Sequence, residues 1–199
     1  PMLQLLGLVA REPPADSGAD SVRDEKVKVL KSLRPFTRAS AHEASVRGQY
    51  RDGVVGGKSV PPYTQETGRP SATETFVALR ADIGNWRWAG VPFYIRTGKR
   101  LAQRHTEITI QFKRTPFEIF RNAPVHNHTN QLVMQIQPVE GISLSFGAKV
   151  PGPVLRVGSV NMSFEYTKYF GADAYTGYEV LIYECMIGDA TLFQRADMV

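Results

Sequence analysis

The fold is decided by Thr73-Glu-Thr-Phe-Val-Ala-Leu-Arg-Ala-Asp-Ile83, a run in which every second side chain would face the same side of a β-strand. Further runs with a period of two follow at residues 91–96, 107–113, 132–137, 142–146 and 160–166. No helical pattern separates the runs, which disfavours parallel strands joined by crossover helices. The six runs therefore predict one large, mainly antiparallel sheet with a core face and a wetter face that would suit a subunit interface.

Helical patterns lie on both sides of these runs in the chain. Residues 2–10 are apolar nearly all round, which predicts a first helix that other parts of a longer protein cover. A second helix is expected over residues 21–34, with Ser21 as its cap. A third is expected over residues 178–186, where apolar residues recur with helical spacing before Gly188. The order of elements predicts an α+β fold with the helices packed on one face of the sheet.

The segment before the first run, residues 46–71, is rich in glycine and proline and is predicted to be irregular. It contains Gly56-Gly-Lys-Ser59, which resembles part of a phosphate-binding loop. The spacing of that loop and its preceding strand are missing, so a solvated loop is expected here.

The composition fits a globular protein of one ordinary domain or two small ones, with 42% hydrophobic and 22% charged residues among 199. The net charge is +5, but the basic residues are dispersed and there is no basic helix, which disfavours nucleic-acid binding. No apolar run approaches the roughly 18 residues of a membrane span. The lone cysteine, Cys185, excludes an internal disulfide framework. It is expected to be a small buried hydrophobe in a cytoplasmic protein, and no export signal opens the chain.

Several catalytic and cofactor motifs are missing from the chain. There is no dinucleotide fingerprint, no complete phosphate loop, no nucleophile elbow and no zinc-protease motif. His126 and His128 form an H-x-H, but their setting is typical of a surface loop and no carboxylate or cysteine lies nearby in sequence. We therefore expect no metal site.

The densest basic cluster lies between two predicted strands and offers the best local candidates for chemistry. Lys99 and Arg104 stand at the two ends of a short connection that Gly98 opens. Such a connection can close a mobile ammonium and a planar guanidinium around one anion, and a phosphate would suit both groups. The alternative is a basic turn that is merely exposed to solvent.

Several strings in the chain resemble the glucose-6-phosphate dehydrogenase family of bacterial type. Two carry most of the resemblance: Thr73-Glu-Thr-Phe76 and Trp88-Ala-Gly-Val-Pro-Phe-Tyr-Ile-Arg-Thr-Gly-Lys-Arg-Leu101. Others are Met2-Leu-Gln-Leu-Leu6, Val22-Arg-Asp-Glu-Lys-Val-Lys-Val-Leu30, Val46-Arg-Gly-Gln-Tyr50, Asn130-Gln-Leu-Val-Met-Gln-Ile-Gln-Pro138 and the segment from Tyr178 to Phe193. They follow one another in family order and cover nearly the whole chain.

The resemblance implies that residues 1–199 are the C-terminal substrate-binding and dimerisation domain of such an enzyme. It also implies that residue 1 lies partway along one of the helices of that domain. The family oxidises glucose 6-phosphate to the lactone with NADP+, as the first step of the oxidative pentose phosphate pathway. Its Rossmann domain, its general-base histidine and the aspartate that orients it would all lie upstream. We therefore expect no catalytic residue here, no turnover by this chain alone, and a homodimer or tetramer formed through the sheet face.

By the same resemblance, three residues are expected to contact glucose 6-phosphate: Lys99 in the T-G-K string, Arg104 five residues later, and Gln137 in Gln-Ile-Gln-Pro. Their expected role is to capture the sugar phosphate by charge and hydrogen bonds rather than to transfer a proton.

The chain departs from animal members of the family, which hold a second, structural NADP+ in this domain. Animal members hold it through a set of Lys, Arg and Tyr residues, and only Arg96 matches that set here. The other corresponding positions are occupied by His105, Thr109, Gln135, Ser143 and Ser145. We therefore predict no structural NADP+ site. Two alternatives to the enzyme domain are a stand-alone sugar-phosphate-binding or regulatory module and, less favoured, a basic nucleic-acid binder.

Overall fold

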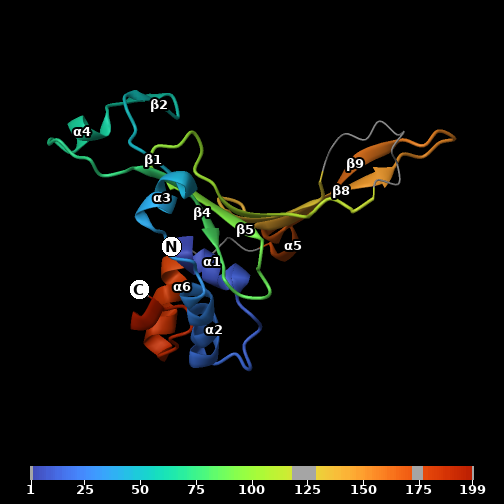
Figure 1. The fold of residues 1–199 in the computed structure, drawn as a ribbon, viewed down its shortest axis with the longest axis horizontal. Helices are drawn as coiled ribbons and strands as arrows, with labels where there is room; N and C mark the ends of the chain where they lie inside the picture. Colours follow the sequence, from blue (N-terminus) through green and yellow to red (C-terminus); the bar gives the residue numbers. More distant parts are fainter. Residues whose placement is uncertain (1, 118–128, 172–176, 199) are drawn as a thin grey trace. The chain divides into compact units, whose positions relative to one another are not determined.

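The computed structural model describes residues 2–117, 129–171 and 177–198, so His126 and His128 lie outside the described residues. The chain divides into two compact units (Figure 1). The first comprises Pro1–Ala102 with Thr176–Val199, and the second is Gln103–Tyr175. Both units combine helices with antiparallel strands, which confirms the predicted α+β class.

The first unit contains a three-stranded antiparallel sheet in the order β1 (Ser45–Gly48), β4 (Phe76–Asp82) and β5 (Pro92–Gly98). The β4–β5 pairing runs from Phe76 opposite Gly98 to Asp82 opposite Pro92. A separate two-stranded hairpin joins β2 (Gly53–Val55) to β3 (Lys58–Val60). This sheet places the end of β5 beside the residues just before β4.

The helices of the first unit are α1 (Met2–Ala10), α2 (Ala19–Lys31), α3 (Arg38–Ala44), α4 (Tyr63–Glu66), α6 (Gly177–Ile187) and the 3₁₀ turn η1 (Ala196–Met198). The core lies where α1 and α2 pack on the end of β4 (Figure 1). Its buried members are Leu6, Ala10, Val29 and Ile83, with Leu33, Trp88, Phe93 and Ile95 packed around them. This arrangement confirms helices against the strands in this unit.

The second unit is a four-stranded antiparallel sheet in the order β6 (Thr106–Gln111), β7 (Gln131–Gln137), β8 (Gly141–Lys149) and β9 (Val157–Glu165), followed by α5 (Tyr166–Phe170). Aromatic rings from α5, including Tyr169 at 4.8 Å between centroids, pack on Phe164 of β9. All six predicted strands are present, but they form two separate sheets rather than one. Alternation within a run shows which residues share a face, and it does not show which runs share hydrogen bonds.

The predicted bounds of the second helix are corrected at both ends. The second helix begins at Ala19 after Gly18, not at Ser21, because the Asp16 carboxylate accepts the Gly18 N–H at 2.7 Å and ends the preceding turn there. The helix ends at Lys31. The backbone of residues 32–34 then runs along the end of β4, where Leu33 forms an isolated bridge with Ile83.

Residues 46–71 are not irregular throughout, because they contain most of β1, the β2–β3 hairpin and α4. The hairpin turn is formed by Gly56 and Gly57, whose φ angles are +57° and +78°. Two consecutive residues in this left-handed region are typical of a two-residue loop that joins the strands of a hairpin, and this backbone conformation favours glycine. Gly56-Gly-Lys-Ser59 is thus the turn and the start of β3 in a hairpin, and not a phosphate loop.

The C-terminal helix is confirmed in position as α6, but its predicted apolar face is largely exposed within the described part of the chain. Tyr178, Ile182 and Met186 are exposed, whereas Leu181 is only half-buried. Cys185 is also exposed, so the expectation of a buried thiol is wrong for this chain. Among the described residues, no helix combines the length and apolar character needed to cross a membrane.

Candidate functional site

The first part of the candidate site is the turn that follows β5. The backbone N–H of Lys99 donates to the carbonyl of Thr75 at 2.8 Å, which extends the β4–β5 pairing by one bond beyond Gly98. A Cβ at Gly98 would lie 2.9 Å from Cδ2 of Phe76 and 3.1 Å from Cδ2 of Leu101. Glycine at position 98 therefore allows the turn to pack closely against β4.

Lys99 presents its side chain to solvent, and within the described ranges no hydrogen bond or ion pair holds its ammonium. Its neighbour Arg100 is different. Arg100 adopts φ +56°, and its guanidinium donates to Oε1 of Glu66 at 2.5 Å. The two neighbouring cations of the turn thus differ: the Lys99 ammonium is not paired within the described ranges, whereas the Arg100 guanidinium is neutralised by the Glu66 carboxylate.

Glu66 also accepts a hydrogen bond from the phenol of Tyr50, so one carboxylate joins two partners. The hydrogen bond from Tyr50, which has the larger effect, and the hydrogen bond from Arg100 both lower the pKa of Glu66 below its ordinary 4.5. The bond to Glu66 raises the pKa of Tyr50 and that of Arg100. All three groups are therefore held in the forms that favour their contacts: an ionised carboxylate, a protonated phenol and a charged guanidinium.

The lowered pKa of Glu66 leads to a prediction on acid stability. Contacts that favour the carboxylate stabilise the fold above the ordinary pKa of about 4.5, and this contribution is lost as the pH falls through the lowered folded value. We expect Glu66→Gln to lower Tm by a constant amount between pH 6 and 8 and by progressively less below pH 4.5. Thermal unfolding of both proteins across this range tests it. A Tm difference that grows on acidification would contradict the assignment.

The second part of the candidate site lies in the second unit, at one end of its sheet. Gln137 is the last residue of β7, and it pairs with Thr106, the first residue of β6. Arg104 precedes Thr106 by two residues. The side chains of Arg104 and Gln137 are exposed, and no interaction within the described residues holds them. The structure thus brings Arg104 and Gln137 to one end of this sheet, and it describes Lys99 within the other unit.

Pairing with carboxylates distinguishes the basic side chains of this cluster. Arg100 is paired with Glu66, and the His105 ring lies 2.8 Å from a carboxylate oxygen of Glu107. Lys99 and Arg104 have no such carboxylate among the residues that the structure describes. An anion that reaches either group would meet a cation whose charge is not already compensated.

Most positions that the resemblance matches to the structural NADP+ site of animal members carry neutral side chains here. Thr109 and Ser143 lie in one row across the sheet, opposite Val133, and the Ser145 hydroxyl donates to Asn161 at 3.2 Å. These neutral side chains offer no cation for a phosphate of NADP+. Across the described ranges there is also no group of three metal-ligating side chains, and the absence of a structural coenzyme stays a prediction.

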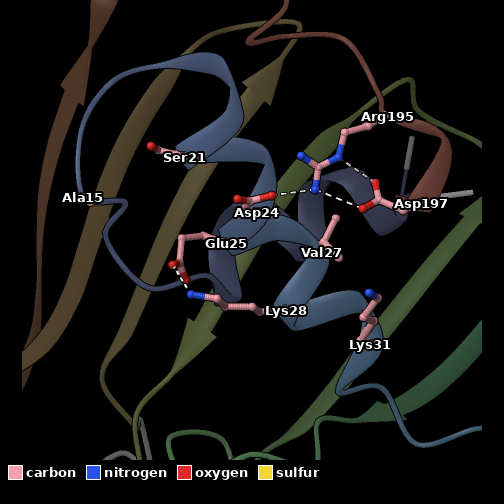
Figure 2. Close-up of a pocket in the computed structure, with 9 residues that line it drawn as sticks. All are labelled: Ala15, Ser21, Asp24, Glu25, Val27, Lys28, Lys31, Arg195 and Asp197. Atoms are coloured by element: carbon pink, nitrogen blue, oxygen red, sulfur yellow. Dashed lines mark hydrogen bonds and ion pairs between the residues drawn. The ribbon is translucent and has the colours of Figure 1, made fainter.

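The first unit also contains a depression of about 390 Å³ between α2 and the C-terminal residues (Figure 2). Its charged groups are largely paired with one another. Arg195 contacts Asp24 at 2.6 Å and Asp197 at 2.8 Å, and Lys28 contacts Glu25 at 2.6 Å. The bond from Arg195 lowers the pKa of Asp197. Because these charges compensate one another, the depression does not favour an anion, and it contains none of the predicted site residues.

The chain is similar to known proteins over its whole length. The family described as "Glucose-6-phosphate dehydrogenase, C-terminal domain" matches residues 1–199. The glucose-6-phosphate 1-dehydrogenase of Aggregatibacter actinomycetemcomitans is 51% identical over 201 residues, and that of Mycolicibacterium smegmatis is 46% identical over 199. Each alignment covers 100% of this chain and 40% of the relative, so the chain spans about two fifths of their length.

Solved structures agree with these matches. A glucose-6-phosphate dehydrogenase in complex with its substrate glucose-6-phosphate is similar with a TM-score of 0.84 and 36% identity, over 98% of this chain and 39% of that one. The glucose-6-phosphate 1-dehydrogenase of Mycobacterium avium gives a TM-score of 0.80 at 36% identity, over 99% of this chain and 39% of that one. The likeness thus extends over nearly the whole chain in sequence and in fold.

Proposed function

Because this chain belongs to the glucose-6-phosphate dehydrogenase family as its C-terminal domain, we propose that it supplies part of the sugar-phosphate site of an enzyme that oxidises D-glucose 6-phosphate to 6-phosphogluconolactone with NADP+. This reaction would be the first step of the oxidative pentose phosphate pathway. The observation that carries the proposal is the likeness, over 98% of the chain, to a dehydrogenase solved with glucose 6-phosphate.

The three site residues have complementary chemistry for a phosphorylated sugar. Lys99 and Arg104 would bind the phosphate dianion, the ammonium as a compact charge and the guanidinium through two parallel N–H groups. The Gln137 amide would add a neutral donor and acceptor for the phosphate or a sugar hydroxyl. Their exposed and unpaired side chains support this role, since each can reach a ligand without first breaking an internal ion pair.

The chemical step is assigned elsewhere in the enzyme. The base that takes the proton from the sugar hydroxyl and the domain that binds NADP+, which accepts the hydride, would come from the part of the relatives that this chain does not match. Lys99, Arg104 and Gln137 would fix the phosphate end of the substrate. Fixing one end of a substrate contributes to the rate by orienting the reacting end.

We further propose that residues 1–199 act in the cytoplasm and assemble as a homodimer or tetramer through the four-stranded sheet, beside their own Rossmann domain. Apolar residues on one face of β8 and β9 support the assembly: Ile142, Val160 and Met162 are 40%, 41% and 61% exposed. An exposed apolar row of this kind is typical of a surface that a partner covers. Light scattering that finds only monomers of the complete natural protein would contradict it.

Coenzyme reduction tests the function. We expect the complete natural protein to reduce NADP+ when glucose 6-phosphate is added, and the 199-residue chain alone to show no turnover at any substrate concentration. Failure of the complete protein to reduce the coenzyme would overturn the proposed function. Turnover by the chain alone would overturn the assignment of the chemical step to another domain.

A further inference from the structure

Thr75 belongs to the Thr73-Glu-Thr-Phe76 string, for which the proposed function has no direct use, yet it is buried and makes three hydrogen bonds. Its N–H donates to the carbonyl of Gly48 at 2.9 Å, and its own carbonyl accepts the N–H of Lys99 at 2.8 Å. Its hydroxyl oxygen accepts the N–H of Tyr50 at 2.9 Å. One residue therefore links the end of β1, the residues after it and the turn that carries Lys99.

Tyr50 extends this connection from Thr75 to the far side of the turn. Its phenol donates to Glu66, and its ring packs edge-on against Tyr63 at 5.6 Å between centroids. Glu66 in turn accepts the guanidinium of Arg100. A closed path of contacts thus runs from the backbone of Lys99 through Thr75, Tyr50 and Glu66 to the side chain of Arg100.

Arg100 needs such support because of its backbone. Among the described residues it is the only non-glycine residue with a positive φ, +56°, a conformation that is costly for an L-residue and persists only where the surrounding contacts hold it. The guanidinium contact to Glu66 holds Arg100 from its side-chain end, and the Lys99 N–H bond holds the turn from its backbone. Lys99 lies between these two attachments with its ammonium free.

We propose that Thr75 and Glu66 are positioning residues, which fix the turn so that the Lys99 ammonium is presented to the substrate phosphate while Arg100 is kept away from it. The inference rests on the proposed function, because it gives Lys99 a ligand. Neither Thr75 nor Glu66 contacts that ligand in this scheme. Both act through Lys99, and this dependence distinguishes the proposal from a general effect on stability.

The test is a set of variants of the complete natural protein, each made alone and in a Lys99→Met background. Thr75→Val removes the acceptor of the Tyr50 N–H, and Glu66→Gln removes the charge that holds Arg100. Thr75→Ser keeps the hydroxyl and serves as the conservative rescue. Glu12→Gln is the matched control, because it breaks another exposed ion pair, at 2.6 Å to Arg87, that makes no contact with the turn.

We expect Thr75→Val and Glu66→Gln each to raise KM for glucose 6-phosphate by about three- to tenfold, with kcat changed by less than about twofold, because a misplaced cation weakens capture and leaves the reacting end unaltered. Thr75→Ser and Glu12→Gln should leave KM unchanged. In the Lys99→Met background neither positioning variant should raise KM further. Glu66 is exposed, so its variant carries the test even if Thr75→Val unfolds the protein.

Two outcomes overturn the inference. One is an unchanged KM in Glu66→Gln, and the other is an increase that persists in full when Lys99 is already methionine. A third outcome is separate: if Lys99→Met alone leaves KM unchanged, then the assignment of Lys99 to the substrate site fails, and the positioning role fails with it. The single and double variants together therefore show which of the two proposals is wrong.

Discussion

Replacing Lys99 with methionine is expected to lower kcat/KM for glucose 6-phosphate by about 10- to 100-fold in the complete natural protein. The change removes a charge-assisted hydrogen bond to a dianion, which contributes about 1.5–3 kcal/mol, and methionine keeps most of the side-chain volume. Steady-state kinetics with varied glucose 6-phosphate measure it. The KM for the coenzyme should stay the same, because the coenzyme is bound by another domain in the proposed enzyme.

Lys58→Met is the matched control for this substitution. Lys58 is an exposed lysine of the same unit, at the start of β3, and no described side chain is paired with it. Its loss should leave kcat/KM within about twofold, since an exposed charge that does not contact the ligand acts on it only through screened solvent. Equal losses in the two variants would mean that net charge, and not a specific contact, attracts the substrate.

The second large effect concerns stability. Ile83→Ala should lower the free energy of unfolding of the 199-residue chain by about 2–5 kcal/mol, because the Ile83 side chain is 2% exposed within the cluster formed by α1, α2 and β5. Ile182→Ala removes the same atoms from a residue that is 62% exposed on α6, and it should cost much less. Urea denaturation of the three proteins tests this. If Ile182→Ala lowered the free energy of unfolding as much as Ile83→Ala does, the assignment of the core to the cluster around Ile83 would be wrong.

Strand positions could be predicted from the sequence because alternation is a local property. The run at residues 73–83 contains β4, and the run at 142–146 lies within β8. The division into two sheets could not be predicted in this way, since hydrogen-bond partners depend on how distant runs meet. The start of α2 differs for a local reason: the sequence pattern favoured Ser21 as the cap, whereas the Asp16–Gly18 turn ends three residues earlier and the helix begins directly after it.

The candidate site was predictable only in part. A glycine followed by a basic turn between two strands singled out Lys99 and Arg104 as candidates, and the family resemblance was needed to add Gln137; the role of all three stays a prediction. The sequence could not show which cations are paired, because Arg100 finds its carboxylate 34 residues away and Tyr50 finds Thr75 25 residues away. The same limit applies to α6, whose helical period was correct although periodicity alone does not reveal which face is covered.

The surface location of the Arg100–Glu66 pair also affects how kinetic measurements should be compared. Its two side chains are 41% and 38% exposed, so dissolved ions reach them, and at physiological ionic strength charges are screened over about 8 Å. Added electrolyte would then act twice, once on the attraction between substrate and enzyme and once on the contact that holds the turn. Michaelis constants obtained in buffers of different ionic composition would therefore mix these two effects, and variants should be ranked in a single buffer.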